Sequence, residues 1–157
     1  MNKSELINDS LIELNVEAQS KEEALKKVAD LVLKAGCVKS AAAYYHGMME
    51  REKNSTTGFG SGIAIPHAKM EEVVQPAICV ITLKDAIDWK AMDDKPVQLL
   101  IALAVPTEHE GSFHLKLLAT LSENLMEDHF VQSLLSARTK HEILTTITGI
   151  FTDKGEV

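Results

Sequence analysis

The sequence has no long apolar run and no excess of positive charge. No apolar stretch approaches the roughly 20 residues that cross a bilayer, and the first ten residues lack the apolar core of a secretory signal. We therefore expect a cytoplasmic protein without direct membrane insertion. The formal net charge of −7 opposes the phosphate backbone of nucleic acids, whose partners need a basic surface. Nucleic acid is thus not the expected partner, and small molecules or proteins remain.

Internal repeats, low-complexity tracts and linkers rich in proline or glycine are also absent from the 157 residues. A chain of this length buries roughly 70% of its unfolded surface as one domain, so we expect a single domain over residues 1–157. Cysteine is scarce: Cys37 and Cys79 are far apart and match no metal-binding spacing. Because both stand among apolar neighbours, we expect buried free thiols.

The hydrophobic pattern predicts helices interspersed with strands. Residues 20–36 form the clearest helix, since Ser20 and Glu23 make a capping box and Gly36 suits the left-handed residue that ends a helix. The pattern favours an α/β sandwich whose interior strands are covered on both faces. Further helices are expected at 40–53, 114–125, 129–137 and 139–147, strands at 10–16, 77–84 and 97–106, and a polar connection at 85–96.

Apolar spacing also predicts which side chains of two helices face the core. The inner positions are expected to be Tyr45, Met48 and Met49 in residues 40–53, and Leu115, Leu118, Ala119 and Leu125 in residues 114–125.

Three glycines, Gly58, Gly60 and Gly62, stand close together before Pro66 and His67. Their spacing matches neither a dinucleotide fingerprint nor a phosphate loop, and taken alone it predicts a tight turn with positive φ. Pro66 lacks an N–H group for strand pairing, so a strand should stop there. His67 would then stand at a strand end, where functional side chains concentrate, although a purely structural histidine is the alternative.

His114 and Arg51 are the other candidates for contact with an anion. His114 opens an amphipathic helix whose first N–H groups attract anions, unless it is an ordinary histidine of a first turn. Arg51 stands near the end of the helix at 40–53, where a solvated arginine is the alternative. The remaining histidines are expected to be exposed; they are His46, His109, His129 and His141.

The sequence motifs argue against a catalytic metal site and against acyl transfer by a serine. The sequence has no H-E-x-x-H, and the serine of GFGSG is displaced from its place in a nucleophile elbow. We expect no metal and no cofactor.

His67, His114 and Arg51 together fit phosphoryl transfer through histidine. A neutral imidazole attacks an activated phosphoryl group, and a guanidinium with N–H donors holds its oxygens.

The segments STTGFGSGIAIPHAK, AIDWKAMDDKPVQLLIALAVP and HLKLLATLSENL resemble the enzyme IIA domain of the fructose–mannitol class, or type 2, in the bacterial phosphoenolpyruvate-dependent sugar phosphotransferase system. The resemblance covers roughly residues 11–147 and implies a three-layer α/β/α sandwich around a mixed sheet. It implies that His67 accepts a phosphoryl group from the phosphocarrier HPr and passes it to enzyme IIB. His114 would assist, and Arg51 would hold the phosphoryl group while the glycines let the backbone approach it.

Two functions within this class are compatible with the sequence. The first is a phosphocarrier for sugar uptake, expected to be of the fructose type. The second is a nitrogen-related regulatory enzyme IIA whose phosphorylation state controls protein binding. An α/β ligand-binding domain without covalent chemistry is a third interpretation, because a fold alone does not determine a function.

Overall fold

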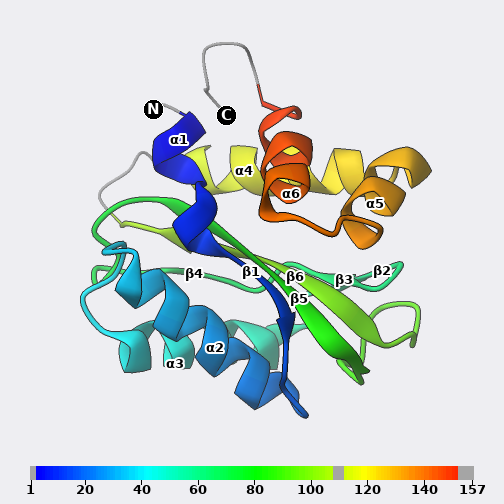
Figure 1. Ribbon diagram of the computed structural model, residues 1–157. Helices are drawn as coiled ribbons and strands as arrows, with labels where there is room; N and C mark the ends of the chain where they lie inside the picture. Colours follow the sequence, from blue (N-terminus) through cyan, green and yellow to red (C-terminus); the bar gives the residue numbers. More distant parts are fainter. Residues whose placement is uncertain (1–2, 108–111, 152–157) are drawn as a thin grey trace.

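A mixed sheet of six strands lies between two layers of helices (Figure 1). The computed structural model describes residues 3–107 and 112–151, with side chains for residues 5–107 and 115–151. The strands are β1 (Ile12–Val16), β2 (Gly58–Gly60), β3 (Ile63–Ala64), β4 (His67–Lys69), β5 (Ala77–Ile87) and β6 (Val97–Val105). The helices are α1 (Lys3–Leu6), α2 (Lys21–Lys34), α3 (Ala41–Asn54), α4 (Ser112–Leu125), α5 (Asp128–Leu135) and α6 (Lys140–Thr148), with a 3₁₀ turn η1 (Asp9–Leu11).

The sheet combines parallel and antiparallel neighbours in the order β1-β5-β6-β3-β2, and β4 pairs with β6 as well. Strands β5 and β6 are antiparallel, as are β2 and β3, whereas β1 runs parallel to β5 and both β3 and β4 run parallel to β6. The long apolar runs of β5 and β6 suit this central position, because both of their faces are covered. The predicted α/β sandwich with a mixed sheet is confirmed.

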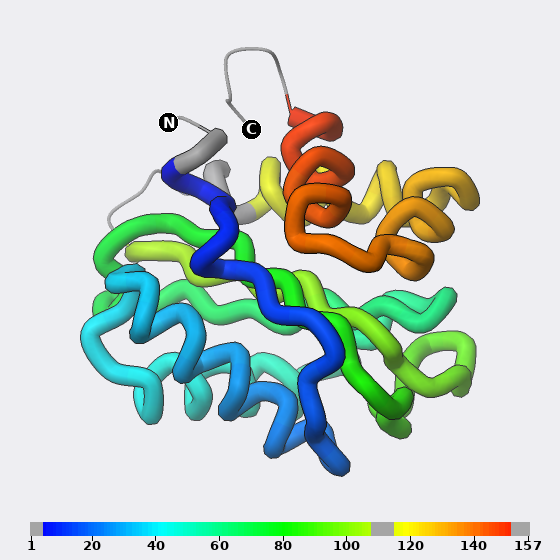
Figure 2. The backbone as a smooth tube through the Cα atoms, viewed as in Figure 1, coloured from blue at the N-terminus to red at the C-terminus, as the bar shows by residue number. Residues whose placement is uncertain are grey.

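Helices α2 and α3 cover one face of the sheet, and α4, α5 and α6 cover the other (Figures 1 and 2). Alternate side chains of the central strands enter two separate apolar layers, one under each set of helices. Cys79 and Ile81 of β5 pack with α2 and α3, whereas Ile78 and Val80 pack with α4, α5 and α6. Cys37 and Cys79 are buried free thiols, as expected. Burial raises the pKa of the Cys79 thiol far above its usual range, so this thiol is a poor candidate for nucleophilic chemistry.

The predicted helix caps are present with one difference. Ser20 Oγ accepts the N–H of Glu23 at 3.1 Å, and Gly36 ends the turn after α2 with φ +80°. The Glu23 carboxylate accepts the N–H of Gln19 at 3.0 Å, one residue before the N-cap that a capping box uses. The carboxylate therefore ties the residue preceding the cap to the first turn of α2.

The inner face of α4 differs from the expectation. The buried residues of α4 are Leu117, Leu121 and Leu125, so the expectation holds for Leu125. Leu118 is half-buried against the same core, whereas Leu115 is 66% exposed and Ala119 is also exposed. Residues at i, i+4 and i+8 align along one side of a helix, which explains the buried set. In α3, Met48 is fully buried as predicted, and Tyr45 and Met49 are half-buried against the same core. Tyr44, which was not among the expected inner positions, is fully buried as well.

Two other expectations about the strands are corrected. The first predicted strand begins at Ile12, because residues before it form η1. The segment 85–96 is not simply a polar connection, since β5 continues to Ile87 and Trp89 is fully buried. The indole of Trp89 thereby becomes part of the core that lies under α2 and α3.

Candidate functional site

The glycine run forms the β-hairpin of β2 and β3. Its two central residues, Ser61 and Gly62, both have positive φ (58° and 87°), as a type I′ turn requires. Gly58 has a different role, because a Cβ at this position would lie 2.7 Å from Ala91. The tight-turn interpretation therefore applies to Gly62, and Gly60 beside the turn also has positive φ (122°). Gly58 instead permits close packing against the connection between β5 and β6.

Pro66 interrupts the chain between β3 and β4, as its chemistry predicts. Strand β3 ends at Ala64, and β4 begins at His67. His67 does not enter a loop, which differs from the expectation, because the backbone resumes pairing at once. The carbonyl of Pro66 accepts the N–H of Leu103 at 2.9 Å, and His67 stands opposite Leu103 in the parallel pair with β6. A strand on each side of the proline thus fixes the backbone of His67.

The imidazole of His67 is held in one tautomer. Its Nδ1 lies 2.8 Å from the carbonyl oxygen of Ile65, which can only accept, so Nδ1 carries the proton and the neutral ring keeps its lone pair on Nε2. Residue His67 is 5% exposed. Burial lowers its pKa, the charge of Arg51 lowers it further, and the bond to Ile65 opposes these effects without reversing them. The neutral ring therefore predominates at pH 7.

Two surface pockets meet at His67 and Arg51, which line both of them. The larger pocket has a volume of about 390 Å³ and a polar wall that includes Glu50, Asn54 and Lys69. The smaller has a volume of about 180 Å³, and its wall is formed by Thr56, Thr57, Gly58, Phe59, Ile65, Met92, Leu118 and Ser122. His67 is thus poorly exposed but is not sealed in the core, and it shares its pockets with a guanidinium.

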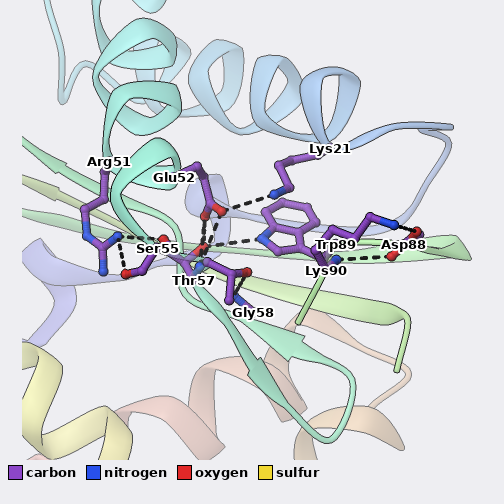
Figure 3. A network of polar contacts seen from close by, with 10 residues as sticks. Lys21, Arg51, Glu52, Ser55, Thr57, Gly58, Asp88, Trp89 and Lys90 are labelled. Carbon is purple, nitrogen blue, oxygen red and sulfur yellow. Dashed lines mark hydrogen bonds and ion pairs between the residues drawn. The ribbon is translucent and has the colours of Figure 1, made fainter. Parts of the chain in front are cut away.

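Arg51 reaches these pockets from the last turn of α3. Its Nη1 donates to the carbonyl of Ser55 at 2.8 Å and lies 3.4 Å from the Ser55 hydroxyl (Figure 3). Among the described residues, its Nε and Nη2 donors make no hydrogen bond. The guanidinium is therefore anchored through one nitrogen and retains two further nitrogens as donors for an anion.

The backbone of His114 lies in the first turn of α4, as predicted, but its side chain lies outside the described residues. Leu118 and Ser122, four and eight residues further along α4, line the smaller pocket. Residues with this spacing share one face of a helix, so position 114 belongs to the pocket face of α4. His46, His129 and His141 are exposed as predicted, and His109 lies outside the described residues.

A family model described as "Phosphoenolpyruvate-dependent sugar phosphotransferase system, EIIA 2" matches residues 5–149. The chain belongs to this EIIA type-2 family. Membership confirms the resemblance inferred from the sequence and implies a part in phosphoryl transfer.

Relatives of this EIIA protein include single-component and longer proteins. A "PTS system fructose-specific EIIA component" from Haloferax volcanii is 39% identical over 133 residues, which cover 85% of this chain and 86% of the relative. The "PTS system fructose-specific EIIABC component" of Bacillus subtilis is 36% identical over 92% of this chain. The match spans only 22% of that relative's length.

Solved structures of the same fold include a nitrogen regulatory protein and an enzyme IIA bound to enzyme IIB. The nitrogen regulatory protein IIA-Ntr from Neisseria meningitidis has a TM-score of 0.85 and 29% identity, covering 92% of this chain and 97% of that one. Enzyme IIAMTL of Escherichia coli, solved in complex with phosphorylated enzyme IIBMTL, has a TM-score of 0.77 and 22% identity, covering 91% of this chain and 97% of that one. At this low identity, the likeness to enzyme IIAMTL shows only that the two chains share a fold.

Beside Arg51, the EIIA structure contains a buried polar cluster that the sequence did not indicate. We call it the Glu52 network; its members are Lys21, Glu52, Thr57 and Trp89 (Figure 3). The Glu52 side chain is only 4% exposed, although a charged residue near a helix end is ordinarily solvated. Hydrophobic periodicity carries no signal for such a residue, because its burial depends on partners from other elements.

Neither a metal-binding cluster nor a membrane-spanning helix is present among the described residues. No group of three or more His, Cys, Asp or Glu side chains is arranged to bind a metal ion in that part of the chain. Within the same residues, every helix is too short or too polar to span a bilayer.

Proposed function

We propose that this EIIA protein carries a phosphoryl group on His67. It accepts the group from HPr and passes it to enzyme IIB for sugar uptake, which we assign to the fructose type. The observation that supports this proposal is the pairing of His67 and Arg51, which line the same two pockets while a carbonyl holds the imidazole in one tautomer. The residue types match the needs of phosphoryl transfer, in which the protein supplies a nucleophile, orientation and positive charge.

The proposed reaction uses Nε2 of His67 as the nucleophile. As this nitrogen forms a bond to phosphorus, the bond between phosphorus and the donor breaks, and the donor keeps that electron pair. The imidazole then carries positive charge, which the hydrogen bond from Nδ1 to the Ile65 carbonyl stabilises. The donors of Arg51 bind the phosphoryl oxygens. In the second step, a cysteine thiolate of enzyme IIB attacks phosphorus, and Nε2 leaves with the electrons of the P–N bond.

His114 is proposed to assist His67. The support is its position in the sequence of α4, because Leu118 and Ser122 of the same helix face line the smaller pocket. A second imidazole beside the acceptor would provide another donor to the phosphoryl oxygens.

The regulatory alternative has a specific observation in its favour, which is the likeness to IIA-Ntr. The 39% identical fructose-specific EIIA component favours the transport function. The two functions differ in the fate of the phosphoryl group. A transport EIIA passes it on to enzyme IIB, whereas a regulatory EIIA keeps it and changes its binding to other proteins.

A phosphorelay assay with the variant His67→Ala tests the proposal. Radiolabelled phospho-HPr should label the wild-type chain and the control variant His46→Ala, which changes an exposed histidine, but should not label His67→Ala. Undiminished labelling of folded His67→Ala would refute the proposal. Adding a fructose-type enzyme IIB should then remove the label from the wild type. A label that is formed but not passed to any enzyme IIB would favour the regulatory alternative.

A further inference from the structure

Glu52 is a buried carboxylate for which the proposed chemistry has no direct use. Its side chain is 4% exposed and lies 3.2 Å from the ammonium of Lys21, whose side chain is 20% exposed. A buried carboxylate without partners is strongly destabilising, so a chain retains one only where its hydrogen bonds are satisfied. The contacts of this carboxylate therefore indicate what it holds in place.

Glu52 and its partner Thr57 lie on opposite sides of the turn that follows α3 (Figure 3). Both carboxylate oxygens lie 3.3 Å from the backbone N–H of Thr57, and the Thr57 hydroxyl donates to Oε1. Glu52 thus joins the last turn of α3 to the residue that leads into β2. The bond from Arg51 Nη1 to the carbonyl of Ser55 lies inside this closed turn.

Two other elements fix the same cluster from outside. The Trp89 Nε1–H lies 3.4 Å from the Thr57 hydroxyl oxygen, which can accept it while donating to Glu52. The ammonium of Lys21 lies 5.2 Å from the centre of the Trp89 ring, within the range of a cation–π contact. Lys21 from α2 and Trp89 from the connection between β5 and β6 therefore hold the turn in place beside α3.

We propose that Glu52 is a positioning residue for phosphoryl transfer. By closing the turn at 53–56, its carboxylate fixes the Ser55 carbonyl that anchors the Arg51 guanidinium in the pockets shared with His67. It also fixes Thr57 and Gly58, which form part of the wall of the smaller pocket. This inference rests on the proposed function, since it presumes that Arg51 holds the phosphoryl group.

The variant Glu52→Gln tests the inference with little change of shape. The Lys21 ammonium, the Thr57 N–H and the Thr57 hydroxyl are all donors to Glu52. An amide NH₂ group must face at least one of these donors, so the turn should loosen. We expect phosphorylation of His67 by phosphoramidate, a small donor that needs no protein docking, to slow about 10- to 100-fold, as misplaced catalytic groups do.

A second pair of variants isolates the hydroxyl contact. Thr57→Val keeps the shape of the side chain but removes the donor to Glu52, whereas Thr57→Ser restores it. Thr57→Val should slow phosphorylation and Thr57→Ser should return it to near the wild-type rate. This pair also decides the matter if Glu52→Gln does not fold. The control Glu17→Gln makes the same chemical change at an exposed pair with Lys84, where Glu17 lines neither pocket, and should leave the rate unchanged.

The pKa of His67, measured by NMR titration of its ring, separates positioning from a purely structural role. The charge of Arg51 lowers this pKa, so Arg51→Gln should raise it, and Glu52→Gln should raise it in the same direction by releasing the guanidinium. Folded Glu52→Gln with a wild-type rate and a wild-type His67 pKa would overturn the inference. Failure of the proposed function would look different, because folded His67→Ala would then be labelled by phospho-HPr.

Discussion

His67 combines burial with a nearby cation, and both keep its ring neutral. Its pKa in the folded chain is below the value of about 6.5 expected when unfolded. In the pH range below 6.5 the unfolded chain therefore binds more protons, and the stability present above pH 6.5 is lost as the pH falls through the folded pKa. We expect His67→Gln to remove this part of the acid sensitivity. Urea unfolding of both proteins at pH 7.5 and 5.5 measures it.

Exposed His141 supplies the control for this experiment, because His141→Gln removes a histidine that is open to solvent. That variant should retain the wild-type loss of stability between the two pH values. An equal acid sensitivity of wild type and His67→Gln would contradict the depressed pKa. The ring titration of His67 in the wild type, followed by NMR, should independently give a midpoint below 6.5.

A sequence pattern predicts residues whose chemistry is local, but not residues whose role depends on tertiary partners. The break in strand pairing before His67 could be predicted, because Pro66 has no N–H group to donate to a neighbouring strand. For Arg51, the sequence predicts only a positive charge near the end of a helix. Glu52 could not be predicted, because its burial depends on Lys21 from α2 and Thr57 from beyond the turn. The pockets at His67 likewise depend on how α3 and α4 pack against the sheet.

Helix α3 carries Arg51 close to β4 because a glycine permits the approach. A Cβ at Gly47, one turn before Arg51, would lie 3.0 Å from the sulfur of Met70 and 3.1 Å from Cβ of Ala68. Gly47→Ala should therefore shift α3 by a few tenths of an ångström. The better helix propensity of alanine, about 1 kcal/mol, offsets much of the packing strain of about 1–3 kcal/mol. We expect slower phosphorylation of His67 with only a modest change in the free energy of unfolding.

Gly36→Ala is the matched control for this prediction. Gly36 has φ +80° and nothing within 4 Å of an added Cβ, so alanine meets backbone strain but no neighbour. The strain should cost about 1–2 kcal/mol of stability. Phosphorylation by phosphoramidate at a temperature where the variant is folded should proceed at the wild-type rate. Equal rates in wild type and Gly47→Ala would show that the approach of α3 to β4 has no bearing on the site.

Most elements were predictable because periodicity and caps are properties of a short stretch of chain. The cap at Ser20 and the apolar runs of β5 and β6 are examples. The short strands β2, β3 and β4 have two or three residues each and no usable periodicity. Their existence depends on pairing with β6 and with one another, which a local pattern does not contain.

The whole molecule has two apolar layers that share one sheet, and we propose that residues 1–157 fold as a single domain. Trp89, the only tryptophan, is fully buried in the layer under α2 and α3. Leu121 of α4 is fully buried in the opposite layer. Leu121→Ala should cost about 2–5 kcal/mol, as large-to-small changes in a core do. If the layers unfold together, this loss of stability must also lower the unfolding midpoint reported by Trp89 in the other layer.

The measurement is urea unfolding followed by Trp89 fluorescence and by far-ultraviolet circular dichroism in the same samples. In Leu121→Ala both midpoints should fall together and remain coincident. Val28→Ala, which removes methyl groups from the Trp89 layer, should likewise lower both. A fluorescence midpoint that stays at the wild-type value in Leu121→Ala would mean that the layers unfold separately. The coupling is expected because β5 and β6 contribute alternate side chains to both layers. Opening either layer would expose one apolar face of the sheet that both layers share.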